Sequence, residues 1–226
     1  EVLKRAGELA AKVGPAVGKA MMGPVVHGIP QFYGGPLVVA PFDALGDMLR
    51  STRGVLKDMY RRPDQLLEAC HMYAEMILDQ VYDPAQPSFG TSPFVFIPLH
   101  KGADAFMSNE QFQTFYWPSL KKVMLGLVEE GYVPTPFVEG SYDRRLHIIQ
   151  DFPEGAVLWH FDQTNMKRAK EMLGDRACIM GNVPASLTAT GTPGKMRTYC
   201  RELIETCAED GNFILTNGCQ VDEGRE

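Results

Sequence analysis

The sequence lacks the features that mark a membrane protein or a nucleic-acid-binding protein. No apolar run approaches the roughly 18 residues that suggest a membrane span. Its 22 lysine and arginine residues are outnumbered by 28 aspartate and glutamate residues, which gives a net charge of −6. Basic residues form no cluster beyond pairs such as Arg61-Arg62 and Lys121-Lys122, so a phosphate backbone is a poor partner. We therefore expect no membrane span and no nucleic-acid partner.

Signals for disulfides, export and nucleotide binding are also missing. The five cysteines are an odd number, form no CxxC pair and lie in a chain too long to depend on disulfides, so we expect a reducing cytoplasm. No signal peptide opens the chain. No GxGxxG motif follows an apolar run and no Walker-type motif occurs, which disfavours nucleotide-binding folds.

The length of 226 residues suits one domain with a single large core. The chain opens on Glu1 in helix-like, alanine-rich sequence without a starting methionine, and it stops in polar sequence after Val221. We expect a single domain over residues 1–226, truncated at both ends.

Six short apolar runs recur along the chain, and each ends in polar, acidic or glycine residues before a helix-like stretch. They lie at 37–41, 94–98, 132–138, 156–162, 178–182 and 213–219. Nearly all-apolar strands that alternate with helices indicate a parallel sheet covered on both faces. A doubly wound sheet and a β/α barrel both fit. We favour the α/β barrel, with about six of its eight strands here, because polar residues follow nearly every strand.

Several helices carry recognisable start signals. Pro63 precedes a stretch whose apolar residues recur at three and four positions. Ser108-Asn109-Glu110 opens a helix that we expect to run to about Glu130, and Thr192-Pro193 opens one that reaches Cys207.

Ionisable side chains at strand ends are the first candidates for function. His100 and Lys101 follow one strand, where a barrel places its chemistry, and a role as rim residues is the equal alternative. Asp43 stands at a helix start, where capping is the stronger interpretation. Asp162, with Asn165 close behind, fits a helix cap and a substrate contact equally well. Cys219 follows the turn Asn217-Gly218, and by itself it reads as a buried core thiol.

Four blocks taken together resemble the uroporphyrinogen decarboxylase superfamily. They are Ala40-Pro41-Phe42-Asp43, the segment from Phe112 to Pro118, the unit from Lys170 to Pro184, and Thr216-Asn217-Gly218-Cys219. The resemblance covers nearly the whole chain and implies a TIM-type barrel with its site at the C-terminal ends of the strands. It also implies one of two chemistries. One is decarboxylation of a tetrapyrrole without a cofactor, and the other is methyl transfer to or from a corrinoid with zinc activation.

Cys219 favours the methyltransferase branch. In the decarboxylases the last strand turn resembles a Gly-His pair, whereas Cys219 looks like the cysteine that ligates zinc in the methyltransferases. The resemblance thereby implies zinc, a corrinoid protein as partner and a small methyl donor or acceptor. Asp43 and Asp162 become candidate cofactor contacts, and His100, Lys101 and Asn182 become candidates for orienting the substrate.

The expected zinc ligands depart from the pattern of the family. Where the methyltransferases have His-x-Cys, this chain has Phe137-Val138-Glu139, so Glu139 joins Cys219, with His160 as third ligand and Glu154 in reserve. The alternatives are structural. Glu139 could pair with Arg144 or Arg145, and His160 and Cys219 could belong to the core.

Two further functions remain open. A decarboxylase needs cationic groups to hold the carboxylates of its substrate and an acid to protonate the carbanion, and in the family the arginine-rich segment lies before the region that this chain covers. The third possibility is a non-catalytic barrel subunit.

Overall fold

A computed structural model describes residues 2–27, 36–83 and 92–220. Its centre is one sheet of five strands: β1 Phe94–Leu99, β2 Val133–Val138, β3 Leu158–Phe161, β4 Cys178–Val183 and β5 Phe213–Asn217. All neighbouring pairs are parallel, and the strands follow one another in chain order. A doubly wound sheet reverses its strand order partway, whereas a barrel does not. The prediction of an α/β fold of the TIM-barrel type is therefore confirmed.

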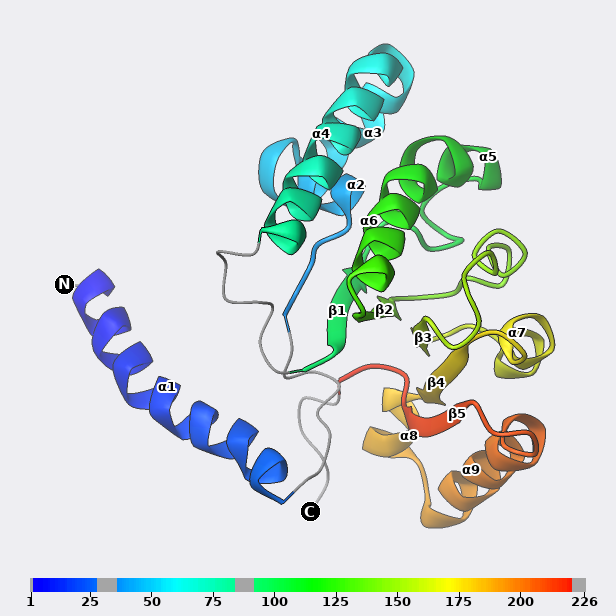
Figure 1. The fold of residues 1–226 in the computed structure, drawn as a ribbon. Helices are drawn as coiled ribbons and strands as arrows, with labels where there is room; N and C mark the ends of the chain where they lie inside the picture. The colour runs from blue at the N-terminus through cyan, green and yellow to red at the C-terminus, as the bar shows by residue number, and fades with distance from the viewer. Residues whose placement is uncertain (1, 28–35, 84–91, 221–226) are drawn as a thin grey trace.

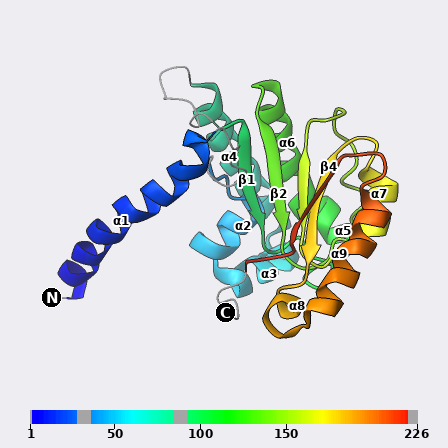
Figure 2. The ribbon, with the colours of Figure 1, turned by 90° about the horizontal axis from the view of Figure 1, so that it is seen from below.

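The helical segments alternate with the strands. They are α1 Val2–Val26, α2 Pro41–Ala44, the π-helical turn η1 Leu45–Leu49, α3 Ser51–Arg61, α4 Pro63–Tyr82, α5 Asn109–Gln111, the π-helical turn η2 Phe112–Tyr116, α6 Trp117–Glu129, α7 Met166–Leu173, α8 Ala185–Thr190 and α9 Pro193–Cys207. In Figure 1 the strands form an arc, and α6, α7 and α9 lie on its convex side. Helix α1 lies apart from the sheet in Figures 1 and 2. Within the described residues no helix is both long and apolar enough to span a bilayer.

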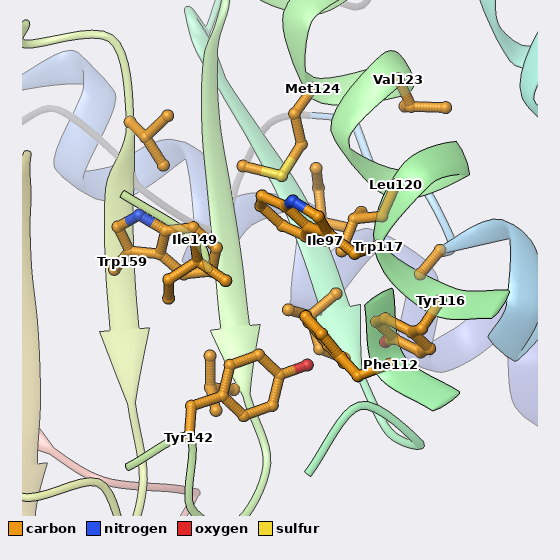
Figure 3. Packing of buried hydrophobic residues seen from close by; sticks show 14 of the residues in the cluster. Ile97, Phe112, Tyr116, Trp117, Leu120, Val123, Met124, Tyr142, Ile149 and Trp159 are labelled. Atoms are coloured by element: carbon orange, nitrogen blue, oxygen red, sulfur yellow. The ribbon is translucent and has the colours of Figure 1, made fainter. Parts of the chain in front are cut away.

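The main core lies between the convex face of the sheet and its helices. Ile97 of β1 and Trp159 of β3 point from the sheet toward Trp117 and Leu120 of α6, as Figure 3 shows. Trp159 is 1% exposed and Leu120 is fully buried. Burying a side chain of this size contributes roughly 1.5–3 kcal/mol, so this face holds the sheet and helices together.

The start signals of the helices act as predicted. Ser108 accepts a hydrogen bond from the Gln111 amide while the Gln111 side chain accepts one from Ser108, which completes a capping box. Thr192 caps α9, and Pro63 occupies the first turn of α4. The structure also decides which residue caps α7: Asn165 does so, and Asp162 does not.

Two predicted elements differ in the structure. The run 37–41 is not a strand, since Leu37 forms only an isolated bridge to Phe96 before Pro41 begins α2. Prolines just before this run and at its end limit its pairing with a neighbouring strand, because proline has no amide proton to donate to a backbone hydrogen bond. The helix expected from Glu110 to Glu130 is interrupted by the π-helical turn η2, which ends just before Trp117-Pro118. Pro118 cannot make the helical bond to the preceding turn, and the wider turn accommodates it.

Candidate functional site

The polar residues predicted at strand ends do gather along one edge of the sheet. Leu99, Val138 and Phe161 are register partners at the ends of β1, β2 and β3, so the residues that follow them are neighbours. These followers are His100, Glu139 and Asp162. Asn182 lies near the end of β4, and Cys219 follows β5. The C-terminal edge of the sheet is therefore the candidate active site.

Asp47 connects two of the predicted catalytic residues. Its carboxylate lies 2.7 Å from Nδ1 of His100 and also accepts a hydrogen bond from Nζ of Lys101. The Lys101 side chain is only 5% exposed, so Asp47 neutralises a buried ammonium group. Partial burial alone would raise the pKa of Asp47, but the hydrogen bonds from Lys101 and His100 bring it below its ordinary value. Nε2 of His100 lies 3.8 Å from the Glu139 carboxylate, which joins the ends of β1 and β2.

Asp47 was not among the residues predicted for the site. The signal was present, because Asp43 and Asp47 are four residues apart and such residues share a helix face. Its role depends on contacts with a strand end more than fifty residues away. No pattern in the sequence reports such a contact.

Asp43 is buried behind the C-terminal end of β1 and binds the backbone there. Its carboxylate accepts hydrogen bonds from the backbone amides of His100 and Lys101, at 2.9 and 3.0 Å, and from the Tyr116 hydroxyl at 2.6 Å. The side chain is fully buried, and this burial raises the pKa of Asp43 despite the three donors. Asp43 lies in the first turn of α2, as the sequence indicated, but its side chain makes no capping hydrogen bond there because both carboxylate oxygens bind the β1 end and Tyr116. A cofactor contact by Asp43 stays a prediction.

The loop after β1 is also held by contacts with Tyr142 and Arg145. A Cβ atom on Gly102 would lie 1.9 Å from the hydroxyl oxygen of Tyr142, so the loop packs there without room for a side chain. The fully buried guanidinium of Arg145 donates to the carbonyl oxygens of Gly102 and Met107, and it lies 3.6 Å from Asp104. Arg145 is therefore committed to this loop and does not pair with Glu139.

Asp162 connects the ends of β2, β3 and β5. One of its carboxylate oxygens accepts hydrogen bonds from the Gly140 amide and the Gln163 side chain, both at 3.1 Å. A Cβ atom on Gly218 would lie 2.8 Å from the Asp162 carbonyl oxygen, so only glycine lets the β5 turn approach this closely. This approach places Cys219 beside Asp162. Burial raises the pKa of the Cys219 thiol, and the negative charges of Asp162 and Glu139 raise it further.

His160 does not join the other predicted zinc ligands. Its ring packs on Phe137 with centroids 4.7 Å apart, and its Nε2 donates to the Asn217 carbonyl oxygen at 2.8 Å. Burial lowers the pKa of His160, and the bond to Asn217 opposes that change. The reserve ligand Glu154 precedes β3 and therefore lies at the opposite edge of the sheet. No group of three histidine, cysteine, aspartate or glutamate side chains in the described part of the chain is placed to hold a metal ion.

A cleft of about 760 Å³ opens beside Cys219. Asp162, Asn182 and Tyr199 line it together with the thiol. The Asn182 amide nitrogen donates to the Thr164 carbonyl oxygen at 2.7 Å, and its amide oxygen accepts from the Tyr199 hydroxyl at 3.2 Å. Asn182 is thus a fixed part of the wall, and the structure brings Asp162, Asn182 and Cys219 into one pocket.

Parallel strands in chain order define a fold of the TIM-barrel type, and ionisable groups along their C-terminal edge make that edge the candidate site. Comparison with known families identifies the group more closely. The uroporphyrinogen decarboxylase (URO-D) family matches residues 34–224, so the chain belongs to this family, as its sequence blocks indicated.

Two similar proteins each match this chain over only part of their own length. A uroporphyrinogen decarboxylase from Chlorobium phaeobacteroides (strain DSM 266 / SMG 266 / 2430) is 24% identical over 175 residues, covering 72% of this chain and 44% of that protein. The solved structure of a methyltransferase from Methanosarcina mazei matches with a TM-score of 0.59 and 18% identity, covering 82% of this chain and 52% of that one. At that identity the second likeness shows the fold alone. The chain spans about half the length of these relatives.

Proposed function

We propose that this chain forms the site-bearing part of a methyltransferase of the URO-D family, which moves a methyl group to or from a corrinoid carried by a partner protein. The observation that carries the proposal is the position of the Cys219 thiol, on the C-terminal edge of the sheet beside Asp162 and Glu139. A thiol in this place can act as a metal ligand or face a methyl donor. A reducing, cytoplasmic setting belongs to the same proposal, and all five cysteines are free thiols.

Within this proposal the described residues have separable tasks. Asp47 holds His100 and the buried Lys101 in place, so that the imidazole faces Glu139. Asp162 holds the β2 turn through Gly140 and keeps Cys219 at the edge of the cleft. Such fixed groups favour catalysis because their ordering is complete before the substrate binds.

Zinc binding stays a prediction. The donor types suit zinc, since thiolate, carboxylate and imidazole are all accepted ligands. Their placement does not, because His160 is turned to Asn217 and no set of three ligands gathers among the described residues. Bound zinc would supply Lewis-acid activation of a thiol or of a methyl ether. We assign no step to it in this arrangement.

The test uses the full-length protein that contains this chain. Demethylation of methylcobalamin, followed by its visible absorption in the presence of small thiol acceptors, measures methyl transfer directly. We expect Cys219→Ala to slow it by roughly a hundredfold or more, the order of effect seen when a main transition-state contact is removed. Cys200→Ala is the matched control, because Cys200 is a free, half-buried cysteine of α9 outside the edge.

Two results would decide against the proposal. One is equal methyl transfer by Cys219→Ala and the unchanged protein. The other is methyl transfer that is absent from both while the protein releases carbon dioxide from uroporphyrinogen. Elemental analysis of the same samples tests zinc separately: about one zinc per chain that is lost in Cys219→Ala would support the zinc prediction, and no stoichiometric zinc would contradict it.

A tetrapyrrole decarboxylase is the second candidate, and the match to the uroporphyrinogen decarboxylase of Chlorobium phaeobacteroides favours it. That chemistry needs cations for the substrate carboxylates. At this edge Lys101 is neutralised by Asp47, and Arg145 is held by Gly102 and Met107. Neither of these two cations is free to bind a substrate carboxylate, which leaves Lys167 as the basic residue among the described residues that line the cleft.

A further inference from the structure

The cleft beside Cys219 has the size and the walls of a small-molecule site. Its volume of about 760 Å³ lies within the roughly 300–1,000 Å³ usual for ligand pockets. The segment that leads from β3 into α7, the start of α8 and one side of α9 enclose it, and Cys219 stands where the cleft meets the sheet edge. A molecule at this end of the cleft would therefore contact Cys219.

The charges of the lining are predominantly negative. Asp143, Asp162 and Glu202 line the cleft, and Lys167 is the single basic residue among its described lining residues. None of these four side chains takes part in a salt bridge with another described residue. The cleft therefore keeps a surplus of about two negative charges that no described partner neutralises. A cleft lined by charges of one sign raises the local concentration of ligands of opposite charge and repels ligands of like charge.

The remaining walls are partly apolar and preformed. Met166 and Leu203 contribute buried apolar surface, and Pro184 also lines the cleft. The Tyr199 hydroxyl is held by Asn182, so the aromatic wall does not depend on a ligand for its position. Apolar walls with a few fixed polar groups suit the alkyl groups of a ligand, while the acidic residues suit a positive centre.

We propose that this cleft binds a small organic cation of the quaternary alkylammonium type beside Cys219, as a methyl donor whose nitrogen leaves as the neutral tertiary amine when its methyl group passes to the corrinoid of the partner protein. The proposal rests on the proposed methyl-transfer function for that role. Binding itself rests only on the charge, size and walls of the cleft. A substrate with several carboxylates is disfavoured by the same charges, which separates this site from one built for a tetrapyrrole.

The experiment measures binding to the full-length protein by isothermal titration calorimetry. The probes are choline, its uncharged analogue in which carbon replaces the ammonium nitrogen, and citrate as a polycarboxylate. We expect choline to bind at least roughly fivefold more tightly than its neutral analogue, with an affinity that falls as salt is added, and we expect no binding of citrate.

Two residues of α9 provide a matched pair of variants. Glu202 lines the cleft, whereas Glu205, three residues further along the same helix, is exposed and does not line it. We expect Glu202→Gln to weaken choline binding roughly threefold to fivefold and Glu205→Gln to leave it unchanged, as for one partly screened charge contact. Equal affinity for choline and its neutral analogue, binding of citrate, or equal effects of the two variants would overturn the proposal.

The methyl-transfer assay separates the two proposals. If choline fails to bind but methyl transfer still depends on Cys219, the ligand class is wrong and the proposed function stands. If choline binds at Glu202 while Cys219→Ala leaves methyl transfer unchanged, the cleft is a cation site and the proposed function is wrong.

Discussion

At the scale of single residues, the site depends on two aspartates that divide the work of holding one strand end. Asp43 receives the backbone amides of His100 and Lys101, and Asp47 receives their side chains. Both aspartates come from the segment that precedes α3, far from β1 in the sequence. The direction of the His100 and Lys101 side chains is therefore set by residues that precede them by more than fifty positions.

Replacing Asp47 should destabilise the protein in a pH-dependent way. Asp47→Asn leaves the Lys101 ammonium, 5% exposed, without its partner, and we expect a loss of about 2 kcal/mol near pH 7. Because the folded-state pKa of Asp47 lies below its ordinary value of 3.8, its stabilisation is present above that value and lost as the pH falls through the folded-state pKa. Urea unfolding at a series of pH values measures the effect.

The control for this prediction is Asp79→Asn, since Asp79 is an exposed residue of α4. It should change the free energy of unfolding by less than about 0.5 kcal/mol. A difference between the protein and Asp47→Asn that stays constant from pH 7 to pH 3 would contradict the proposed ion pair.

Removing the Asp43 carboxylate should cost more. Asp43→Ala leaves two backbone amides and the Tyr116 hydroxyl without an acceptor in a fully buried place. Each unsatisfied donor costs about 1–3 kcal/mol, so we expect a loss of about 3 kcal/mol or more in urea unfolding. A loss below about 1 kcal/mol would show that water or a rearranged loop replaces the carboxylate.

At the scale of elements, the loop between β1 and α5 is closely packed and has little room for larger side chains. It carries His100 and Lys101, and it passes Tyr142 so closely that Gly102 has no room for a side chain. Figure 3 shows Tyr142 and Tyr116 on the two sides of Phe112, within the core that lies behind this loop. The loop is thus positioned by the hydrophobic core as well as by the two aspartates.

Gly102→Ala should destabilise this loop through crowding. The added carbon would lie 1.9 Å from the Tyr142 hydroxyl oxygen and 2.8 Å from the Tyr116 ring, and overpacking of this kind costs typically about 1–3 kcal/mol. Thermal or urea unfolding measures the loss. The double variant Gly102→Ala with Tyr142→Phe should recover part of it, because it removes the nearest atom.

Gly194→Ala is the matched control for this change. An added carbon at Gly194, in the first turn of α9, meets nothing closer than 4.0 Å. It should leave stability unchanged or raise it by up to about 1 kcal/mol, because alanine favours helix. If both glycine variants behaved alike, the close approach of Tyr142 would not be the cause.

At the scale of the whole molecule, the sheet is an arc of parallel strands whose members differ in burial. Every residue of β3 is buried, whereas no residue of β5 is, and Leu215 of β5 is 39% exposed. Within the described residues β5 pairs only with β4. The last strand of the arc, which carries Cys219 at its end, is therefore its least protected.

Amide hydrogen exchange should reveal this gradient. Measured by mass spectrometry on the 226-residue chain, exchange should be slowest in β2 and β3 and faster in β5, because opening an edge strand breaks one ladder instead of two. Peptides of β1 serve as the internal comparison, since β1 pairs with β2 and only bridges to Leu37 on its other side. Equal protection of β3 and β5 would mean that β5 is covered in solution.

The sequence by itself determined the class of fold, the family and the edge on which the candidate site residues lie. Apolar runs alternating with helices encode local structure and burial, and turn residues encode where each strand ends, so Glu139, Asp162 and Cys219 could be placed at one edge from their positions alone. Only the tertiary structure decided what those residues touch. It turned His160 toward Asn217, put Asp43 beneath the site and added Asp47 to it. The physical reason is the distance along the chain over which each effect acts. Helix and strand periodicity depends on residues close in sequence, whereas a hydrogen bond across the edge depends on how distant segments pack together.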